Sequence, residues 1–369
     1  MTNFSELTFA RALTTDGWLL FSTRALRLFA YGFLSVILAL YLAQVGLRET
    51  EIGLLLTLTL IGDAAISLWI TTSADRIGRR KMLLLGAALM IFAGIIFALT
   101  QNIVLLIVAA IIGVISPSGG EIGPFLSIEQ AALAQIIPND QRTRVFAWYN
   151  LVGSFATATG ALCSGALAQI LHANGIAPLD SYRAIVLGYA MLGIALALMF
   201  ARLSPVVETP GRVVSTKIGL HRSRGIVLKL SALFALDAFA GGFVVQSWLA
   251  YWFQIRFGIE PGMLGAIFFG ANILAGISAL SAARIAARVG LINTMVWTHI
   301  PSNILLILVP LMPNAPLAIL VLLARFSISQ MDVPTRQSYT MAVVAPDERS
   351  AASGITTIAR SVGAALSPS

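Results

Sequence analysis

Long apolar runs alternate with short polar segments along the whole chain. A polar leader covers residues 1–16, and apolar runs then cover residues 17–44, 51–74, 82–100, 103–136, 145–171, 183–203, 229–256, 262–283, 291–312, 315–345 and 350–369. Each run is near or above the ~20 residues that an α-helix needs to cross a bilayer core of ~30 Å. A transmembrane β-barrel would instead show segments of ~10 residues with alternating polarity. The pattern therefore predicts an all-α polytopic membrane protein with eleven visible spans.

The longest of these runs, 103–136, contains a cluster of prolines and glycines between Pro117 and Pro124. Proline removes a backbone donor and bends or breaks a helix. Because no charged loop divides the run, we expect one kinked helix that overshoots the membrane rather than two spans.

The composition supports a membrane location. Of the 369 residues, 58% are hydrophobic and 11% are charged, and the mean hydropathy is +0.88. One soluble core cannot bury that much apolar surface, so the surface must face lipid. The single cysteine, Cys163, lies in an apolar run, which argues against a disulfide framework or a metal cluster.

Motifs of several enzyme classes are absent from the sequence. There is no Gly-x-x-x-x-Gly-Lys-(Ser/Thr) loop for ATP, no His-Glu-x-x-His for zinc, and no Gly-x-Ser-x-Gly nucleophile motif. We therefore expect no enzyme activity and no cofactor.

The net charge of +8 has a topological explanation. If the N-terminus is cytosolic, sixteen of the 24 Lys and Arg residues fall in cytosolic segments and three in outer loops. This bias is typical of the positive-inside rule. We expect a multi-pass protein of the plasma (inner) membrane with a cytosolic N-terminus, and the basic charge requires no nucleic-acid partner.

The chain predicts two related halves. A segment rich in proline, glycine and basic residues, 204–228, separates an N-terminal bundle (1–203) from a C-terminal bundle (229–369). A shift of 207 places Glu129 on Arg336, and a shift of 212 places residues 74–78 on 286–290. Such parallel repeats are typical of some transporters.

Residues 74–81 read Ala-Asp-Arg-Ile-Gly-Arg-Arg-Lys and form a dense polar island between two apolar runs. The island resembles the loop signature of the major facilitator superfamily, roughly Gly-x-Leu-Ala-Asp-Arg-x-Gly-Arg-Arg, with Thr71 and Ser73 in place of the first Gly and the Leu. The resemblance implies two pseudo-symmetric six-helix bundles, alternating access and a small-molecule substrate. It also implies a gating motif composed of Asp75, Arg76, Gly78, Arg79 and Arg80.

Three features depart from the family pattern. The arginine that the family often carries in helix 4 would lie near Ile115, and the nearest analogue is Arg325 in the second half. Helix 5 lacks the Gly-Pro ending typical of antiporters. The chain stops at Ser369 inside its eleventh span, so we expect a twelfth helix to be missing.

The resemblance also suggests a role for Asp75. A carboxylate is stabilised at the positive, N-terminal end of a helix. In this family the neighbouring helix is the eleventh, which here begins near Arg349. We expect Asp75 to dock there as a latch that holds the inner side shut.

Ionisable residues at membrane depth are the main candidates for substrate binding or coupling, since each is costly unless it is paired or hydrated. Arg24 and Arg27 share one face of the first span, and Asp237 lies at the equivalent height in the seventh. We expect one of these arginines to face Asp237 across a central cavity; the alternative is that Arg24 extends to the cytosolic interface.

Other candidates are acids in the second, fourth and tenth spans. For Asp63 there are two alternatives: it carries a proton, or it is a structural acid that accepts a hydrogen bond. Glu121 and Glu129 are the stronger proton-coupling candidates, because the resemblance places helix 4 at the cavity. Glu129 aligns with Arg336, one turn after Asp332, so an ion pair between the halves that closes an inner gate is an equal alternative.

These observations favour a monomeric secondary transporter in the lipid bilayer, with proton-coupled efflux of a drug or metabolite by antiport as the specific expectation. The alternative is a transporter-like membrane sensor or assembly protein that no longer transports.

Overall fold

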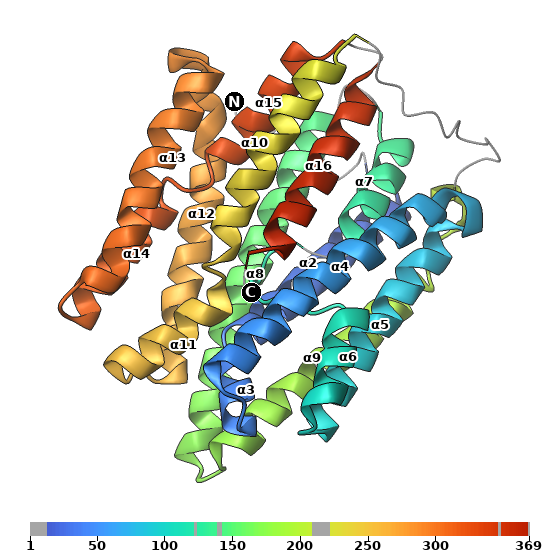
Figure 1. Ribbon diagram of the computed structural model, residues 1–369. Coiled ribbons are helices and arrows are strands. Elements are labelled where there is room, and N and C mark those ends of the chain that lie inside the picture. The colour runs from blue at the N-terminus through green and yellow to red at the C-terminus, as the bar shows by residue number, and fades with distance from the viewer. Residues whose placement is uncertain (1–12, 122–123, 139–141, 209–221, 346–347, 368–369) are drawn as a thin grey trace, which may run out of the picture.

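The computed structural model describes residues 13–121, 124–138, 142–208, 222–345 and 348–367, and these contain helices but no strand (Figure 1). The α-helices are α2 (Thr15–Ser35), α3 (Leu38–Val45), α4 (Glu49–Ile77), α5 (Arg79–Leu99), α6 (Ile103–Ile112), α7 (Phe125–Ile136), α8 (Arg142–Ala173), α9 (Pro178–Phe200), α10 (Arg224–Gly242), α11 (Gln246–Phe257), α12 (Pro261–Val289), α13 (Leu291–Leu308), α14 (Ala315–Phe326), α15 (Asp332–Val343) and α16 (Arg349–Ala365). Short 3₁₀ turns occupy Pro205–Val207 and Val309–Leu311.

The helices confirm the predicted all-α membrane fold. Within the described residues, seven helices or helix pairs are long and apolar enough to cross a membrane, or eight if the bent pair α2–α3 is one span. The remaining predicted spans coincide with shorter helices, among them α6, α14 and α16.

The predicted single kinked helix over 103–136 is wrong. The run forms two helices, α6 and α7, separated by an irregular segment. Pro117 and Pro124 have no backbone N–H to donate, and Gly119 adopts a positive φ of 69° that a helix does not allow. The tenth predicted span is also divided into two helices, α14 and α15, although the turn residues between them, 327–331, include no proline or glycine.

Local signals at the helix ends repeat between the halves. Asn102 and Asn314 cap the N-termini of α6 and α14 with their side chains. Gly46 and Gly258 end α3 and α11 in the left-handed conformation. The members of each pair are 212 residues apart, the same shift that aligns residues 74–78 with 286–290.

Helices before and after segment 209–221 form two groups, called here the first and second halves. In the first half α2 packs on α8 and α5 on α9, and in the second half α10 packs on α16. Three helix pairs join the halves: α8–α12, α4–α16 and α3–α11 (Figure 1).

Glycines allow several of these helices to touch through their backbones. A Cβ atom at Gly160 of α8 would lie 2.1 Å from the carbonyl oxygen of Phe29, and one at Gly165 would lie 2.3 Å from that of Pro261. Helix association in lipid relies on such close packing of small residues. Gly160 therefore holds α8 on α2, and Gly165 holds the two halves together.

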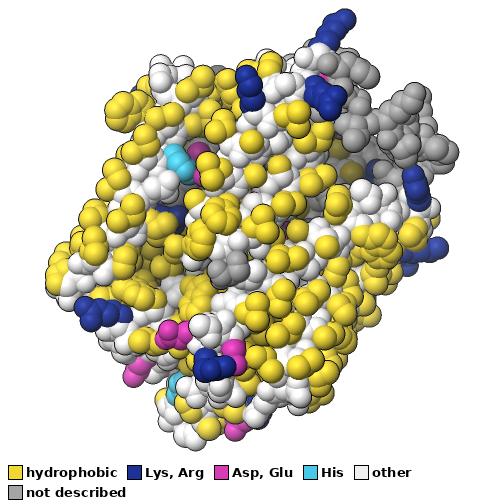
Figure 2. All heavy atoms as spheres, in the orientation of Figure 1, with side chains coloured by type: hydrophobic (Ala, Val, Ile, Leu, Met, Phe, Trp, Pro, Cys, Tyr) yellow, Lys and Arg dark blue, Asp and Glu magenta, His cyan; other side chains and the backbone are white. Residues whose placement is uncertain are grey.

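On the face shown in Figure 2, hydrophobic side chains cover most of the surface, and most charged side chains lie toward the two ends of the molecule. The end at which Arg76, Arg202 and Arg222 lie is called here the basic end. The α2 helix starts at this end, where Asp16 accepts hydrogen bonds from the backbone N–H (3.0 Å) and hydroxyl (2.5 Å) of Ser204. Ser35 lies at the other end of α2.

The halves contact each other through polar groups away from the basic end. The Ser247 hydroxyl donates to the carbonyl oxygens of Ser35 (2.8 Å) and Pro117 (2.7 Å). The Gln169 amide donates to Glu260 at 2.6 Å. Helices α4 and α16 contact each other and separate toward the basic end (Figure 1).

Candidate functional site

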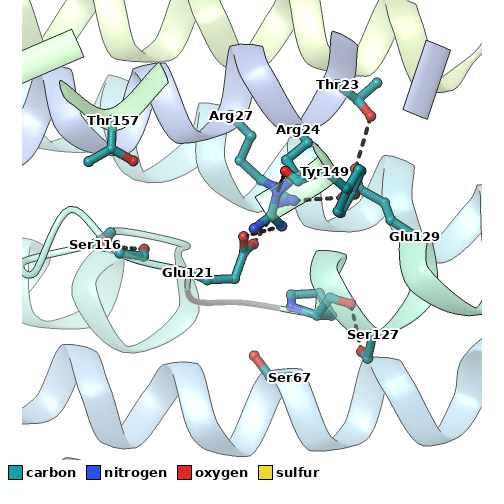
Figure 3. A network of polar contacts seen from close by, with 12 residues as sticks. Thr23, Arg24, Arg27, Ser67, Ser116, Glu121, Ser127, Glu129, Tyr149 and Thr157 are labelled. Carbon is teal, nitrogen blue, oxygen red and sulfur yellow. Dashed lines mark hydrogen bonds and ion pairs between the residues drawn. The ribbon is translucent and has the colours of Figure 1, made fainter. Parts of the chain in front are cut away.

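A buried ion network joins α2 to the broken fourth span (Figure 3). The Glu121 carboxylate bridges two arginines of α2, accepting from Arg24 at 2.8 Å and from Arg27 at 2.8 Å. Arg27 also donates to Glu129 at 2.6 Å. Arg24 and Arg27 share one face of α2, as their spacing predicts, and both carboxylates come from the α6–α7 segment.

Side chains from α2 and α8 complete the shell of this network. The hydroxyls of Thr23 (2.9 Å) and Tyr149 donate to Glu129. The carbonyl of Tyr149 accepts from Arg24 Nε at 2.8 Å, and Asn150 accepts from another nitrogen of Arg24 at 3.1 Å. The guanidinium of Arg24 also lies 4.4 Å from the ring centroid of Tyr149.

Burial differs sharply within the network. The side chains of Arg27 and Glu129 are fully buried, whereas Glu121 is 18% exposed. Two cations and two carboxylates balance each other, which lowers the cost of holding charge at this depth. Glu121 is therefore the carboxylate that water or a solute reaches most directly.

A second ion network lies in the second half of the chain. Asp237 of α10 accepts from Arg336 at 2.9 Å and pairs with His299 Nε2 at 3.1 Å. Arg336 also contacts Asp332, one turn earlier on α15, at 3.2 Å. The network thus joins α10, α13 and α15.

The two networks occupy repeat-related positions with the charges exchanged. In the first half the cation, Arg27, lies on the first span and the carboxylate, Glu129, on the fourth. In the second half the carboxylate, Asp237, lies on the seventh span and the cation, Arg336, on the tenth. A shift of 207 maps Glu129 onto Arg336, and a shift of 212 maps Arg24 onto Leu236, next to Asp237. Opposite charges therefore lie at equivalent or adjacent positions of the two halves.

Two predicted pairings differ from the ion pairs in the structure. Arg24 and Arg27 bind Glu121 and Glu129 rather than Asp237, and Arg336 binds Asp237 rather than Glu129. Each charge instead finds its partner within its own half, because α2 packs on α7 and α10 packs on α15. The alternative in which Arg24 extends to the interface is also wrong, since Arg24 is buried on Glu121.

Sequence reasoning missed two members of these networks. Tyr149 lies near a helix end, where a tyrosine also fits an interfacial aromatic belt, yet it is fully buried with its hydroxyl on Glu129. His299 is bound to Asp237, a carboxylate that carries a second ion pair. For Tyr149 the useful signal is its position on the glycine-rich face of α8, four residues before Gly153, whose Cβ would lie 2.8 Å from Arg24 Nε.

Two other candidates lie outside the networks. Asp63 on α4 accepts a hydrogen bond from the Ser67 hydroxyl at 3.3 Å. Arg325 lies at the end of α14 and forms no ion pair among the described residues. Within those residues no group of His, Cys, Asp and Glu is arranged to hold a metal ion.

The polar island is built into the basic end of the first half. The Glu208 carboxylate accepts from the backbone N–H groups of Arg79 (2.7 Å) and Arg80 (3.1 Å), so it caps the N-terminus of α5. Arg79 in turn donates to Gln135 at 2.9 Å. The side chain of Asp75 lies outside the described residues, so the predicted latch stays a prediction.

The cap of α5 has a counterpart at the start of α10. The Glu348 carboxylate accepts from the backbone N–H groups of Arg222 (2.8 Å) and Ser223 (2.9 Å). A glutamate carboxylate thus binds backbone N–H groups at the start of a helix at the basic end of each half.

The fold and its buried networks define a polytopic helical membrane protein of two repeat-related halves. The sequence profile of the Major Facilitator Superfamily matches residues 20–368, and the chain belongs to this family of membrane transporters.

Relatives and solved structures agree with this assignment. An uncharacterized membrane protein of Saccharomyces cerevisiae, YJR124C, is 30% identical over 97% of this chain and 87% of its own length. The quinolone resistance protein NorA of Staphylococcus aureus is 25% identical over 38% of this chain and 35% of its own length.

Similar folds occur in a bacterial homologue of the human lysosomal transporter Spinster, in an inward-facing and unoccupied conformation, and in the nucleoside transporter NupG. The first has a TM-score of 0.73 with 16% identity over 95% of this chain and 80% of its own. The second has a TM-score of 0.73 with 14% identity over 96% and 89%.

Proposed function

We propose that the protein is a secondary active transporter that moves a small solute by alternating access, coupled to proton flow in the direction of efflux. The two halves rock about the central ion networks and expose them to one side of the membrane at a time. With the N-terminus cytosolic, the basic end is the cytosolic end, and the protein acts in the plasma (inner) membrane.

The observation that carries the proposal is the pair of buried networks with exchanged charges. Intramembrane ionisable residues are expensive to maintain and mark ion or substrate pathways. Arg27 with Glu129 and Asp237 with Arg336 lie beside the irregular breaks in the fourth and tenth spans. Broken helices near the midplane are where transporters bind substrates and coupling ions.

The geometry of Glu121 supports its role as the proton carrier. Its carboxylate holds Arg24 and Arg27 together and is the most exposed acid of its network. Protonation removes its negative charge and weakens both ion pairs at once. Arg24, which has no other acid partner among the described residues, then changes its contacts with Tyr149 and Asn150 of α8, which couples the proton to helix movement.

The arrangement of the halves supports an inward-facing state. Contacts of Ser247 with Ser35 and Pro117 close the end opposite the basic end. Helices α4 and α16 separate toward the basic end. Efflux is favoured by the partial similarity to a protein named for quinolone resistance.

The test is transport by the purified chain in liposomes that contain a pH-sensitive dye. Amphiphilic drugs and metabolites are added singly under an imposed proton gradient. We expect at least one solute to drive a proton flux that empty liposomes do not show. A chain that binds solutes but moves neither solute nor protons would contradict the proposal and favour a sensor.

A further inference from the structure

The tenth span carries an arginine at the middle of the membrane. Arg325 is the eleventh residue of α14 and therefore lies about 15 Å along the helix from its start. Half of a bilayer core is also about 15 Å. The side chain is thus too deep in the span to reach either interface by extending along the helix, although it lies near the end of α14 itself.

Arg325 faces the protein rather than the outer surface. It follows Ala318 and Leu322 at helical spacing, and both of these are fully buried. The opposite face carries Leu317 and Leu320, which are 41% and 62% exposed. The buried face of α14 packs on α12 and α13.

The polar group that continues this face is Ser329. Its backbone N–H donates to the carbonyl of Arg325 at 3.0 Å, so it lies one turn further along, in the break between α14 and α15. Both Arg325 Nε and Ser329 Oγ are buried and have no hydrogen-bond partner among the described residues. Two unfilled donors therefore point from one face of the tenth span.

The lack of a carboxylate partner among the described residues distinguishes Arg325 from the three arginines of the two ion networks. Arg24, Arg27 and Arg336 each lie within 2.9 Å of an acid. The guanidinium of Arg325 instead lies 5.0 Å from the centroid of the Phe326 ring. An arginine stays protonated in proteins, so this half-buried cation, whose Nε has no hydrogen-bond partner in the described part of the chain, is suited to bind an anion from outside the chain.

We propose that Arg325 and Ser329 form a subsite for the oxyanion of an organic solute, a carboxylate or a phosphate ester. The guanidinium provides parallel N–H donors that match two oxygens of such a group, and the hydroxyl provides a third donor. The corresponding break of the first half holds Glu121, which is already neutralised by two arginines. In the second half, the anionic group of the substrate neutralises Arg325.

This inference rests on the proposed transport function for its physiological meaning, but binding tests it separately. The full chain in nanodiscs of zwitterionic lipid is titrated with benzoate and phenyl phosphate, and with benzamide as the neutral match for benzoate. We expect saturable binding of at least one anion and none of benzamide. R325Q should weaken binding at least tenfold, S329A less, and R325K should restore part of the loss because it keeps the charge.

Matched variants separate this subsite from general charge and folding effects. R288Q removes an exposed arginine at the basic end, and S327A removes a hydroxyl that is bound to its own helix at 2.7 Å from the Ala324 carbonyl. Both should bind as the natural sequence does. Anionic lipid in the nanodisc should leave the affinity unchanged if the solute rather than a lipid headgroup fills the subsite.

The outcomes distinguish the two proposals. Anion binding that R325Q abolishes, without any transport, would support the subsite and contradict the transporter. Transport of neutral or cationic solutes that R325Q leaves intact would support the transporter and overturn the subsite. The subsite is also overturned if no anion binds, or if folded R325Q binds anions as well as the natural sequence does.

Discussion

Arg27 donates to Glu129 at 2.6 Å with both side chains fully buried, and the repeat-related pair in the second half, Asp237 and Arg336, meets at 2.9 Å with the charges exchanged. Neither pair crosses between the halves. Each half therefore stabilises its own buried charges and can move as one body. The halves contact each other through the helix pairs α8–α12, α4–α16 and α3–α11.

The buried pair leads to a prediction about stability. Arg27→Met leaves Glu129 buried without its cation, and loss of one partner of a buried pair typically costs about 3–5 kcal/mol. The double variant Arg27→Met with Glu129→Leu removes both charges and should recover most of that loss. Thermal unfolding in detergent measures both, and transport should stay impaired in the double variant. A double variant as unstable as the single one would show that the charges do not act as a pair.

The crossing of α2 and α8 leads to a second prediction. Gly160→Val would force a side chain into the backbone of Phe29, since even a Cβ lies 2.1 Å from its carbonyl oxygen. We expect a folded yield at least tenfold lower, measured by size-exclusion chromatography after extraction. Gly225→Ala is the control, because no atom lies within 4 Å of its Cβ position. Equal yields for the two variants would contradict this packing.

The polar island leads to a kinetic prediction. If Asp75 is a latch at the start of α16, Asp75→Asn should lower the maximal transport rate several-fold and leave the apparent affinity nearly unchanged, because a latch acts on conformational exchange. Initial rates over a range of solute concentrations separate the two effects. A large loss of affinity at a normal maximal rate would place Asp75 at the substrate instead.

The sequence predicts the fold well because hydrophobic run length and positive charge bias are strong physical signals. The 212-residue repeat reappears in the structure at the caps Asn102 and Asn314. The break in 103–136 was predicted only as a kink, since prolines and glycines accompany both kinks and interruptions.

Pairing within the candidate site could not be predicted from residue positions alone. Sequence position gives the depth of Arg27, Glu129 and Asp237 in the membrane but not the direction each side chain faces. The partners depend on which helices pack together, and α2 contacts α7 in its own half. The contact of Tyr149 with Glu129 could not be predicted either, because a tyrosine near a helix end also fits an interfacial position.

The most direct test of coupling compares the natural sequence with Glu121→Gln in liposomes. Glutamine keeps the size and hydrogen-bonding oxygen of Glu121 but cannot carry a proton. We predict that Glu121→Gln still exchanges labelled for unlabelled solute across the membrane but no longer accumulates solute in response to a pH gradient. Accumulation driven by the pH gradient at the rate of the natural sequence would contradict the account.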